Sequence, residues 1–259
     1  MVDYNGKELP PEEVKALQDL EKLDLIAPYN GYNTIPVISE IKANNFGFMV
    51  EDSHIVGLGL TDQYSITKLV ELPESFNSLK SLRYLDLSRT GIETFPECIR
   101  CFKSLEILIM RGFESTSLHY IRKVPEWIGS LKHIKFIDLS YHHLSSIPKS
   151  ISELESLVYL NLRYNSLNAL PYLGNLKKLE LIDISENHFE FFPYNSFAPK
   201  KNNKEGSILK NCSVKIIGMI KGRFSPNPFS STRYEVFEYI RWRKYVLSPI
   251  LLNKISPED

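Results

Sequence analysis

The fold is decided by residues 82–105, which read LRYLDLSRTGIETFPECIRCFKSL. The stretch opens with a frame of the form L-x-x-L-x-L over residues 82–87 and then reaches the pair Phe95-Pro96. Two more apolar residues follow three positions apart, at Ile99 and Phe102. Alternating apolar residues predict a short strand with one buried face, and proline ends that geometry. A step of three residues then fits a helical or 3₁₀ turn.

The same pattern recurs along most of the chain. The strand frame starts at residues 55, 82, 105, 134, 157, 179 and 214, and the last of these frames places Ile216 at its third position. The apolar-proline pairs are Leu72-Pro73, Phe95-Pro96, Val124-Pro125, Ile147-Pro148, Leu170-Pro171 and Phe192-Pro193. Units of this size cannot bury an apolar face alone, so we expect them to stack into a solenoid with a parallel sheet.

These two frames resemble the leucine-rich repeat family, in its intracellular form with repeats of roughly 23 residues. The resemblance covers residues 55 to about 228 and implies an α/β solenoid. Its parallel sheet would line a curved, concave side, and short helical or 3₁₀ segments would form the convex side. The ninth position of each frame should be asparagine, as it is at Asn165 and Asn187. His142 can replace asparagine through its ring nitrogens, whereas Phe113 and Gly222 cannot, so we expect irregularity there.

The repeat region leaves two ends that need covering. Residues 1–54 are predicted to form an N-terminal cap, with a helix over 10–26 and a hairpin strand that leads into the sheet. Residues 55–228 hold about seven repeats, and residues 229–259 are predicted to be a C-terminal cap helix, over 232–247, and a tail. The alternative for this helix is a basic surface that docks a partner or an acidic lipid.

Composition and charge are those of an ordinary globular protein. The 259 residues carry no net charge, with 31 basic and 31 acidic side chains. Residues 1–53 hold 4 basic and 10 acidic residues, whereas residues 195–259 hold 12 and 5. Such polarised ends make weak head-to-tail self-association a hypothesis. With three cysteines, no secretory signal and no apolar run long enough to span a bilayer, we expect a cytoplasmic protein.

The chain holds few candidates for chemistry. Cys98 and Cys101 form a C-x-x-C pair, and His142-His143 is the one histidine pair, but neither has the further ligands that zinc requires. The motifs of phosphate-binding loops, serine hydrolases and zinc proteases are absent. We therefore expect no enzymatic activity, no cofactor, no metal and no small-molecule substrate.

The predicted function is non-catalytic protein–protein interaction, in signalling or scaffolding, through the concave face and inserted rim loops near residues 64–67, 113–120 and 199–206. Exposed tyrosine and arginine side chains commonly anchor such interfaces. The candidate partner-binding residues are Tyr84, Asp86, Arg89, Phe136, Asp138, Tyr141, Tyr159, Arg163 and Tyr164. Replacing Tyr159 by alanine should then weaken partner binding and barely change stability. The alternative is that these residues are simply the common filling of the repeat.

A second function remains open. The basic C-terminal region could bind an anionic surface, either nucleic acid or an acidic membrane, with an affinity that falls steeply with salt. No RNA-binding aromatic motif, helix-turn-helix or zinc finger supports nucleic acid as the ligand, so this partner is disfavoured.

Overall fold

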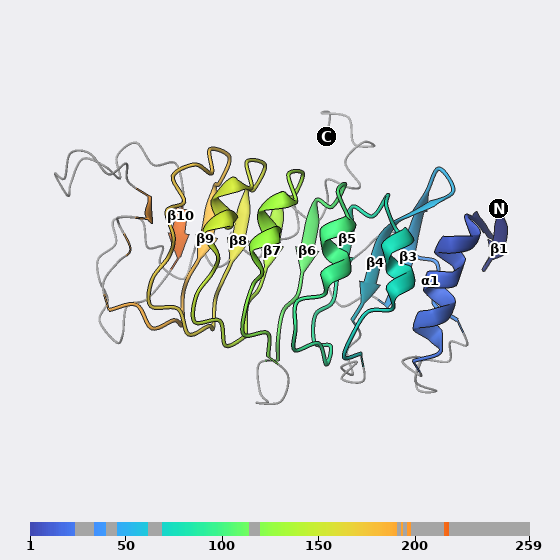
Figure 1. Ribbon diagram of the computed structural model, residues 1–259, viewed down its shortest axis with the longest axis horizontal. Helices are drawn as coiled ribbons and strands as arrows, with labels where there is room; N and C mark the ends of the chain where they lie inside the picture. The colour runs from blue at the N-terminus through green and yellow to red at the C-terminus, as the bar shows by residue number, and fades with distance from the viewer. Residues whose placement is uncertain are drawn as a thin grey trace, which may run out of the picture.

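A computed structural model describes residues 1–23, 34–39, 46–61, 69–113, 120–190, 193, 196–197 and 215–217. Within these residues, a single eight-stranded sheet runs along the stack in the order β10-β9-β8-β7-β6-β5-β4-β3 (Figure 1). Its strands are β3 (Phe46–Glu51), β4 (His54–Leu60), β5 (Tyr84–Asp86), β6 (Ile107–Ile109), β7 (Phe136–Asp138), β8 (Tyr159–Asn161), β9 (Leu181–Asp183) and β10 (Lys215–Ile217). From β4 to β10 every pairing is parallel, as the repeat predicts.

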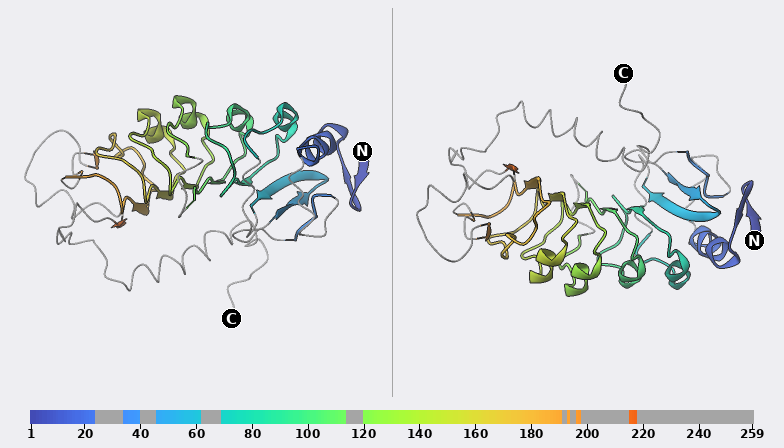
Figure 2. Two further views of the ribbon diagram at one scale, coloured as in Figure 1. Left: turned by 90° about the horizontal axis from the view of Figure 1, so that it is seen from below. Right: turned by 90° about the horizontal axis from the view of Figure 1, so that it is seen from above.

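Short 3₁₀ helices form the other side of the stack (Figure 2). They are η2 (Glu74–Ser78), η3 (Glu97–Cys101), η4 (Glu126–Ser130) and η5 (Lys149–Glu153). Proline precedes each of them and holds the backbone extended just before the turn begins. The apolar residue in the middle of each helix, such as Ile99 in η3 or Ile128 in η4, is fully buried. The predicted strand, proline and 3₁₀ turn are therefore confirmed.

Asparagine at the ninth position links consecutive repeats through the backbone. The side-chain amide of Asn165 donates to the carbonyls of Leu139 (2.9 Å) and Leu162 (3.0 Å), and its oxygen accepts the N–H of Leu144 (3.1 Å). Asn187 repeats this arrangement one unit later. Each asparagine thus satisfies buried backbone groups at the place where the chain leaves the strand.

His142 takes the place of asparagine in the fourth repeat, as predicted. Its Nε2 lies 2.6 Å from the carbonyl oxygen of Met110, and its Nδ1 lies 3.3 Å from the backbone nitrogen of Ile121. These partners assign Nε2 as the donor and Nδ1 as the acceptor, which is the neutral imidazole. Burial lowers the pKa of His142 to about 4, so the ring is neutral at physiological pH.

The N-terminal part joins the sheet through a hairpin and a helix. β3 and β4 pair antiparallel, as predicted, and α1 (Pro11–Glu21) lies beside η2 in the region predicted to be helical (Figure 1). The buried carboxylate of Glu13 accepts the N–H of Ile55 (2.7 Å) and contacts Nδ1 of His54 (2.8 Å). This carboxylate fixes α1 to the first strand of the repeat region.

Three features differ from the sequence prediction or fall outside the described residues. The small antiparallel sheet of β1 (Val2–Tyr4) and β2 (Lys7–Leu9) was not predicted. The register pairs Ile216 with Ile182, whereas the predicted frame paired Ile216 with Leu181, so the seventh frame was placed one residue late. Gly222, the insertions near 64–67 and 199–206, and the predicted helix over 232–247 lie outside the described residues.

Candidate functional site

The sheet face opposite the 3₁₀ helices carries a second apolar cluster, which we call the concave strip. The pleat of each strand sends alternate side chains to opposite faces, so residues next to the core-facing leucines reach this side. The strip consists of Met49, Val56, Tyr84, Ile107, Ile109, Phe136, Tyr159 and Leu181. At its centre the rings of Phe136 and Tyr159 stack with centroids 4.5 Å apart and planes inclined by 26°. The in-register pairing of β7 with β8 places these two rings together.

The prediction that the aromatic residues of this strip are exposed is wrong. Tyr84 is 1% exposed, Phe136 is 2% exposed and Tyr159 is fully buried. Parallel pairing in register brings equivalent positions of successive repeats to within about 4.8 Å, so each side chain is covered on its flanks by its own equivalents. These residues belong to a packed cluster, and replacing one removes buried surface.

A row of polar residues ends the strands beside the strip. Asp86, Asp138 and Asp183 are each 2% exposed, and Oδ1 of each accepts a hydrogen bond from the backbone N–H two residues later (2.9 Å). Asn161 does the same at 3.0 Å. In the turn after Asp138 and in the turn after Asp183, the serine hydroxyl donates a second bond to that oxygen. These oxygens therefore build the turn that follows each strand, in addition to any role of Asp86 and Asp138 toward a partner.

Beyond these turns, arginine and tyrosine side chains stack along the edge of the solenoid. The guanidinium of Arg111 lies 4.7 Å from the ring centroid of Tyr141. The rings of Tyr141 and Tyr164 stack at 4.5 Å, and the guanidinium of Arg163 lies 4.9 Å from the ring centroid of Tyr164. We call these four residues the rim ladder. Arg163 and Tyr141 are half-buried, and Tyr164 is 41% exposed.

The turn that carries Tyr141 or Tyr164, and the same turn in the second repeat, adopts an unusual backbone conformation. Arg89, Tyr141 and Tyr164 have φ values of 58°, 61° and 53°, in the left-handed region that bulky side chains rarely adopt. Such a conformation costs roughly 1–2 kcal/mol per residue. Gly112 holds the equivalent position in the third repeat, where a Cβ atom would lie 1.8 Å from the carbonyl oxygen of Tyr141. A side chain at this turn of the third repeat would therefore collide with the backbone of the fourth.

The candidate site thus differs in composition from the predicted one. The structure brings Tyr141, Arg163 and Tyr164 together on the rim and places Arg89 at the same turn of the second repeat. It buries Tyr84, Phe136 and Tyr159 in the concave strip. Arg111 was missing from the predicted set, although it occupies the same seventh position of its frame as Arg163. That shared position was the signal that could have found it.

The cysteine pair, which the sequence offered as a candidate for metal binding or redox chemistry, lies beside the buried core. Ile99, between the two cysteines, and Phe102, directly after Cys101, are fully buried. Burial also raises the pKa of the Cys98 thiol to about 12. A thiol with so high a pKa is a poor nucleophile at neutral pH. In the described part of the chain, no three His, Cys, Asp or Glu residues lie together as a metal site would need.

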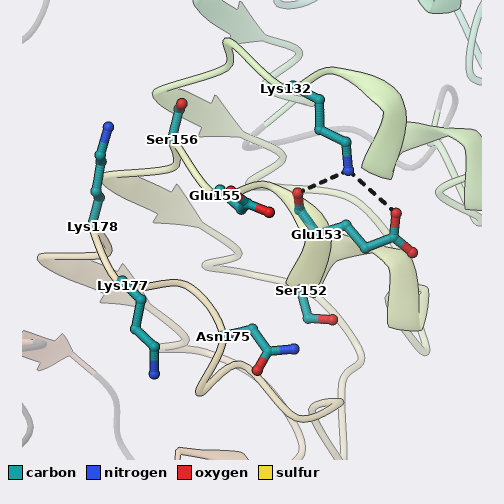
Figure 3. Close-up of a pocket in the computed structure, with 8 residues that line it drawn as sticks. All are labelled: Lys132, Ser152, Glu153, Glu155, Ser156, Asn175, Lys177 and Lys178. Carbon is teal, nitrogen blue, oxygen red and sulfur yellow. Dashed lines mark hydrogen bonds and ion pairs between the residues drawn. The ribbon is translucent and has the colours of Figure 1, made fainter.

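A polar depression lies on the side of the 3₁₀ helices (Figure 3). Lys132 donates to the backbone carbonyl of Glu153 (3.1 Å) and contacts its carboxylate (3.4 Å) across the opening. The depression is lined by Lys132, Ser152, Glu153, Glu155, Ser156, Asn175, Lys177 and Lys178. Lys132 and Glu153 pair with each other there, and Lys177 donates to the backbone carbonyl of Gly174 (2.7 Å).

The observed geometry agrees with comparisons to known proteins. A family model described as Leucine Rich Repeat matches residues 81–102, a stretch that includes β5 and η3. These residues match a leucine-rich repeat, and the chain has the fold of a leucine-rich repeat solenoid. A search of curated proteins found no match. Within the described residues, no helix has both the length and the apolar character that a membrane crossing requires.

A solved structure of a leucine-rich repeat ectodomain shares this fold. The leucine-rich repeat ectodomain of the receptor kinase SOBIR1 from Arabidopsis thaliana matches with a TM-score of 0.50 and 20% identity, over 71% of this chain and 97% of that one. A leucine-rich repeat protein of Leptospira interrogans is 32% identical, with a TM-score of 0.44, over 51% of this chain and 31% of that one. An internalin of Listeria monocytogenes is 16% identical, with a TM-score of 0.44, over 58% and 39% of the two chains. The chain therefore spans less than two fifths of the bacterial proteins that it matches.

Proposed function

We propose that this leucine-rich repeat protein is a non-catalytic protein-interaction module, and that its partner binds the rim ladder. Leucine-rich repeat domains generally mediate protein–protein interaction, and solenoids present extended surfaces for that purpose. The observation that supports the proposal here is the stack of Arg111, Tyr141, Tyr164 and Arg163, in which Tyr164 is 41% exposed.

The rim ladder has the properties of an interface anchor. Tyrosine and arginine dominate the residues that contribute most to binding energy in known interfaces. Stacking fixes the rotamers of Tyr141 and Tyr164 before a partner arrives, so less side-chain entropy is lost on binding. Two arginines against two tyrosine rings also provide donors for carboxylates or backbone carbonyls at the margin of a bound protein.

The test compares proteins retained by the wild-type chain with those retained by the double variant Tyr141→Ala/Tyr164→Ala, using quantitative mass spectrometry and then direct titration of each candidate. We expect a partner whose affinity falls at least about tenfold, since anchor tyrosines contribute about 2 kcal/mol or more. Tyr172→Ala removes another exposed tyrosine outside the rim ladder and is the matched control. Equal affinity of every partner for the double variant and the control would refute the proposal.

A further inference from the structure

We propose that a second depression on the side of the 3₁₀ helices binds an acidic peptide segment of a protein partner. Its lining comes from η3, from η4 and from the turns that follow η2 and η3. We call it the basic depression, and it is lined by Lys80, Arg100, Cys101, Lys103, Trp127 and Ser130. It lies across the sheet from the concave strip (Figure 2) and does not depend on the proposed role of the rim ladder.

The lining of the basic depression holds cations without carboxylates. Among the described residues, Lys80, Arg100 and Lys103 line it and no acidic side chain does, and all three cations are exposed. The depression in Figure 3 differs, because Glu153 and Glu155 lie among its three lysines. Positive charge that no carboxylate compensates attracts anions, and a hollowed surface strengthens that attraction. The basic depression is therefore selective for negatively charged groups.

The register of the repeats explains why this charge is not compensated. The lysine that follows a 3₁₀ helix reaches toward the last residue of the next helix. Lys132 contacts the carboxylate of Glu153 in this way (3.4 Å; Figure 3), whereas Lys103 one repeat earlier donates to the hydroxyl of Ser130 (3.2 Å). The last residue of η3 is a cysteine, so the lysine after η2 also meets no carboxylate at that position.

A reversal of charge limits the basic area to the first repeats. The helices η2, η3 and η4 each begin with glutamate, and a lysine stands two residues after each of them ends. The helix η5 begins with Lys149, and Glu155 stands two residues after its end. The row of lysines is thus interrupted at η5, where carboxylates take its place. A short anionic segment fits this area better than a long polyanion, which would continue onto those carboxylates.

The packing of the 3₁₀ helices leaves room for a ligand between η3 and η4. A Cβ atom on Gly129 of η4 would lie 2.6 Å from the carbonyl oxygen of Ser150 in η5. The glycine therefore allows η5 to approach η4 closely, and η4 packs more closely against η5 than against η3. The hollow lies on the side where the packing is looser.

Trp127 gives the basic depression an aromatic wall of fixed orientation. Its indole Nε1 donates to the carboxylate of Glu97 (3.0 Å), and its ring meets the ring of Phe95 edge-on, with centroids 5.4 Å apart. Both partners belong to the preceding repeat, so the half-buried indole bridges two repeats. Glu97 also pairs with Arg100 (3.5 Å).

An indole beside exposed cations fits a peptide better than a nucleic acid. A peptide can place an apolar or aromatic side chain against Trp127 and its carboxylates against the lysines. Single-stranded nucleic acid is usually held by several aromatic side chains along a continuous basic groove. The glutamates at the starts of η2, η3 and η4 would repel a phosphate backbone that ran along this side of the stack.

Fluorescence anisotropy of a labelled acidic peptide tests the proposal. The probe is fluorescein-labelled Asp-Glu-Asp-Phe-Glu-Asp-Glu, titrated with the full-length chain at low salt. We expect saturable binding with a Kd below about 1 mM, weakening as salt rises, because exposed charge pairs are screened. The double variant Lys80→Gln/Lys103→Gln should bind the probe at least about fivefold more weakly, as expected for the loss of two exposed charge pairs.

The matched control is Lys177→Gln/Lys178→Gln. It removes the same charge from two exposed lysines after the fifth apolar-proline pair, outside the basic depression. Its affinity for the probe should change by less than about twofold, because only long-range attraction is lost. Equal losses for the two double variants, or no saturable binding by the wild type, would overturn the proposal.

A change in the probe tests the aromatic wall without altering the protein. Alanine in place of the phenylalanine of the probe should weaken binding at least about threefold, since ring contacts in interfaces contribute measurably. Trp127→Leu should bind the two probes equally. Unchanged affinity for the alanine probe would remove Trp127 from the site and overturn the proposal as stated. Binding of an oligothymidine strand that Lys80→Gln/Lys103→Gln weakens, without binding of the peptide, would assign the depression to nucleic acid and would also overturn it.

Discussion

The ring of Tyr141 stacks on the ring of Tyr164, with ring centroids 4.5 Å apart and planes inclined by 23°. The two residues hold the same position in consecutive repeats, and both adopt left-handed backbone conformations. The repeat spacing therefore sets the spacing of the two rings, and the stack forms only when the two repeats pair in register. This contact links the fold directly to the surface proposed for binding.

Comparing Tyr164→Gly with Tyr164→Ala distinguishes the stability lost with the ring from the stability cost of the left-handed backbone. Both variants lose the same stacking contacts, but φ at this position is 53°, which glycine adopts freely and alanine does not. We expect Tyr164→Gly to be more stable than Tyr164→Ala by about 1 kcal/mol. Urea unfolding of the two proteins provides the measurement. Higher stability of the alanine variant would show that the backbone is not held in this conformation in solution.

Replacing Tyr159 by alanine should destabilise the protein, contrary to the expectation from the sequence. The ring is fully buried and stacks on Phe136, so its removal should cost about 3–5 kcal/mol, as for other large core aromatics. Leu160→Ala, on the opposite face of the same strand, should cost about 2–5 kcal/mol. Chemical denaturation measures both. A loss below about 1 kcal/mol for Tyr159→Ala would mean that the strip is open to solvent.

His142 should make the stability depend on pH. Burial lowers its pKa to about 4 in the folded protein, against about 6.5 when unfolded, so the unfolded chain takes up a proton first as the pH falls. Its contribution is complete above pH 6.5 and is lost progressively toward pH 4, by up to about 3 kcal/mol. Unfolding free energies of the wild type and His142→Asn, compared at pH 7 and pH 4.5, isolate this effect.

The asparagine variant keeps a residue that the repeat normally uses at this position but cannot be protonated. His143→Asn, which changes the exposed neighbour, is the control and should follow the wild type. If His142→Asn loses as much stability between the two pH values as the wild type does, then other groups account for the pH dependence.

Replacing the buried Asn165 by alanine should destabilise the protein more than the same change at an exposed asparagine, because the Asn165 side chain serves three buried backbone groups. Asn165→Ala leaves those groups without their partner, and each unsatisfied group costs about 1–3 kcal/mol before relaxation. We expect a loss of at least about 2 kcal/mol in thermal or chemical unfolding. Asn175→Ala, at an exposed position, should change the stability by less than about 0.5 kcal/mol. Equal losses from Asn165→Ala and Asn175→Ala would show that the hydrogen bonds of Asn165 add no stability.

Much of the fold follows from spacing alone. The leucine frames place the strands, the prolines place the 3₁₀ turns, and Asn165, Asn187 and His142 make the backbone contacts that their position predicts. The seventh frame was misplaced by one residue because valine, isoleucine and lysine around Ile216 fit two registers nearly equally well. The β1–β2 sheet was missed because two strands of three residues carry too few alternations to be recognised.

For the candidate site too, some features follow from the local sequence and others only from the tertiary structure. Local sequence determines that Tyr84, Phe136 and Tyr159 face away from the leucine core, because side-chain direction in a strand alternates with each residue. The sequence by itself therefore determined the repeat, its parallel sheet and the composition of each face. Only the tertiary structure decided which of those faces is buried and that Arg111, Tyr141, Tyr164 and Arg163 form a continuous stack. The exposure and stacking of a side chain depend on residues one or more repeats away. A local sequence pattern does not specify how those distant residues pack against it.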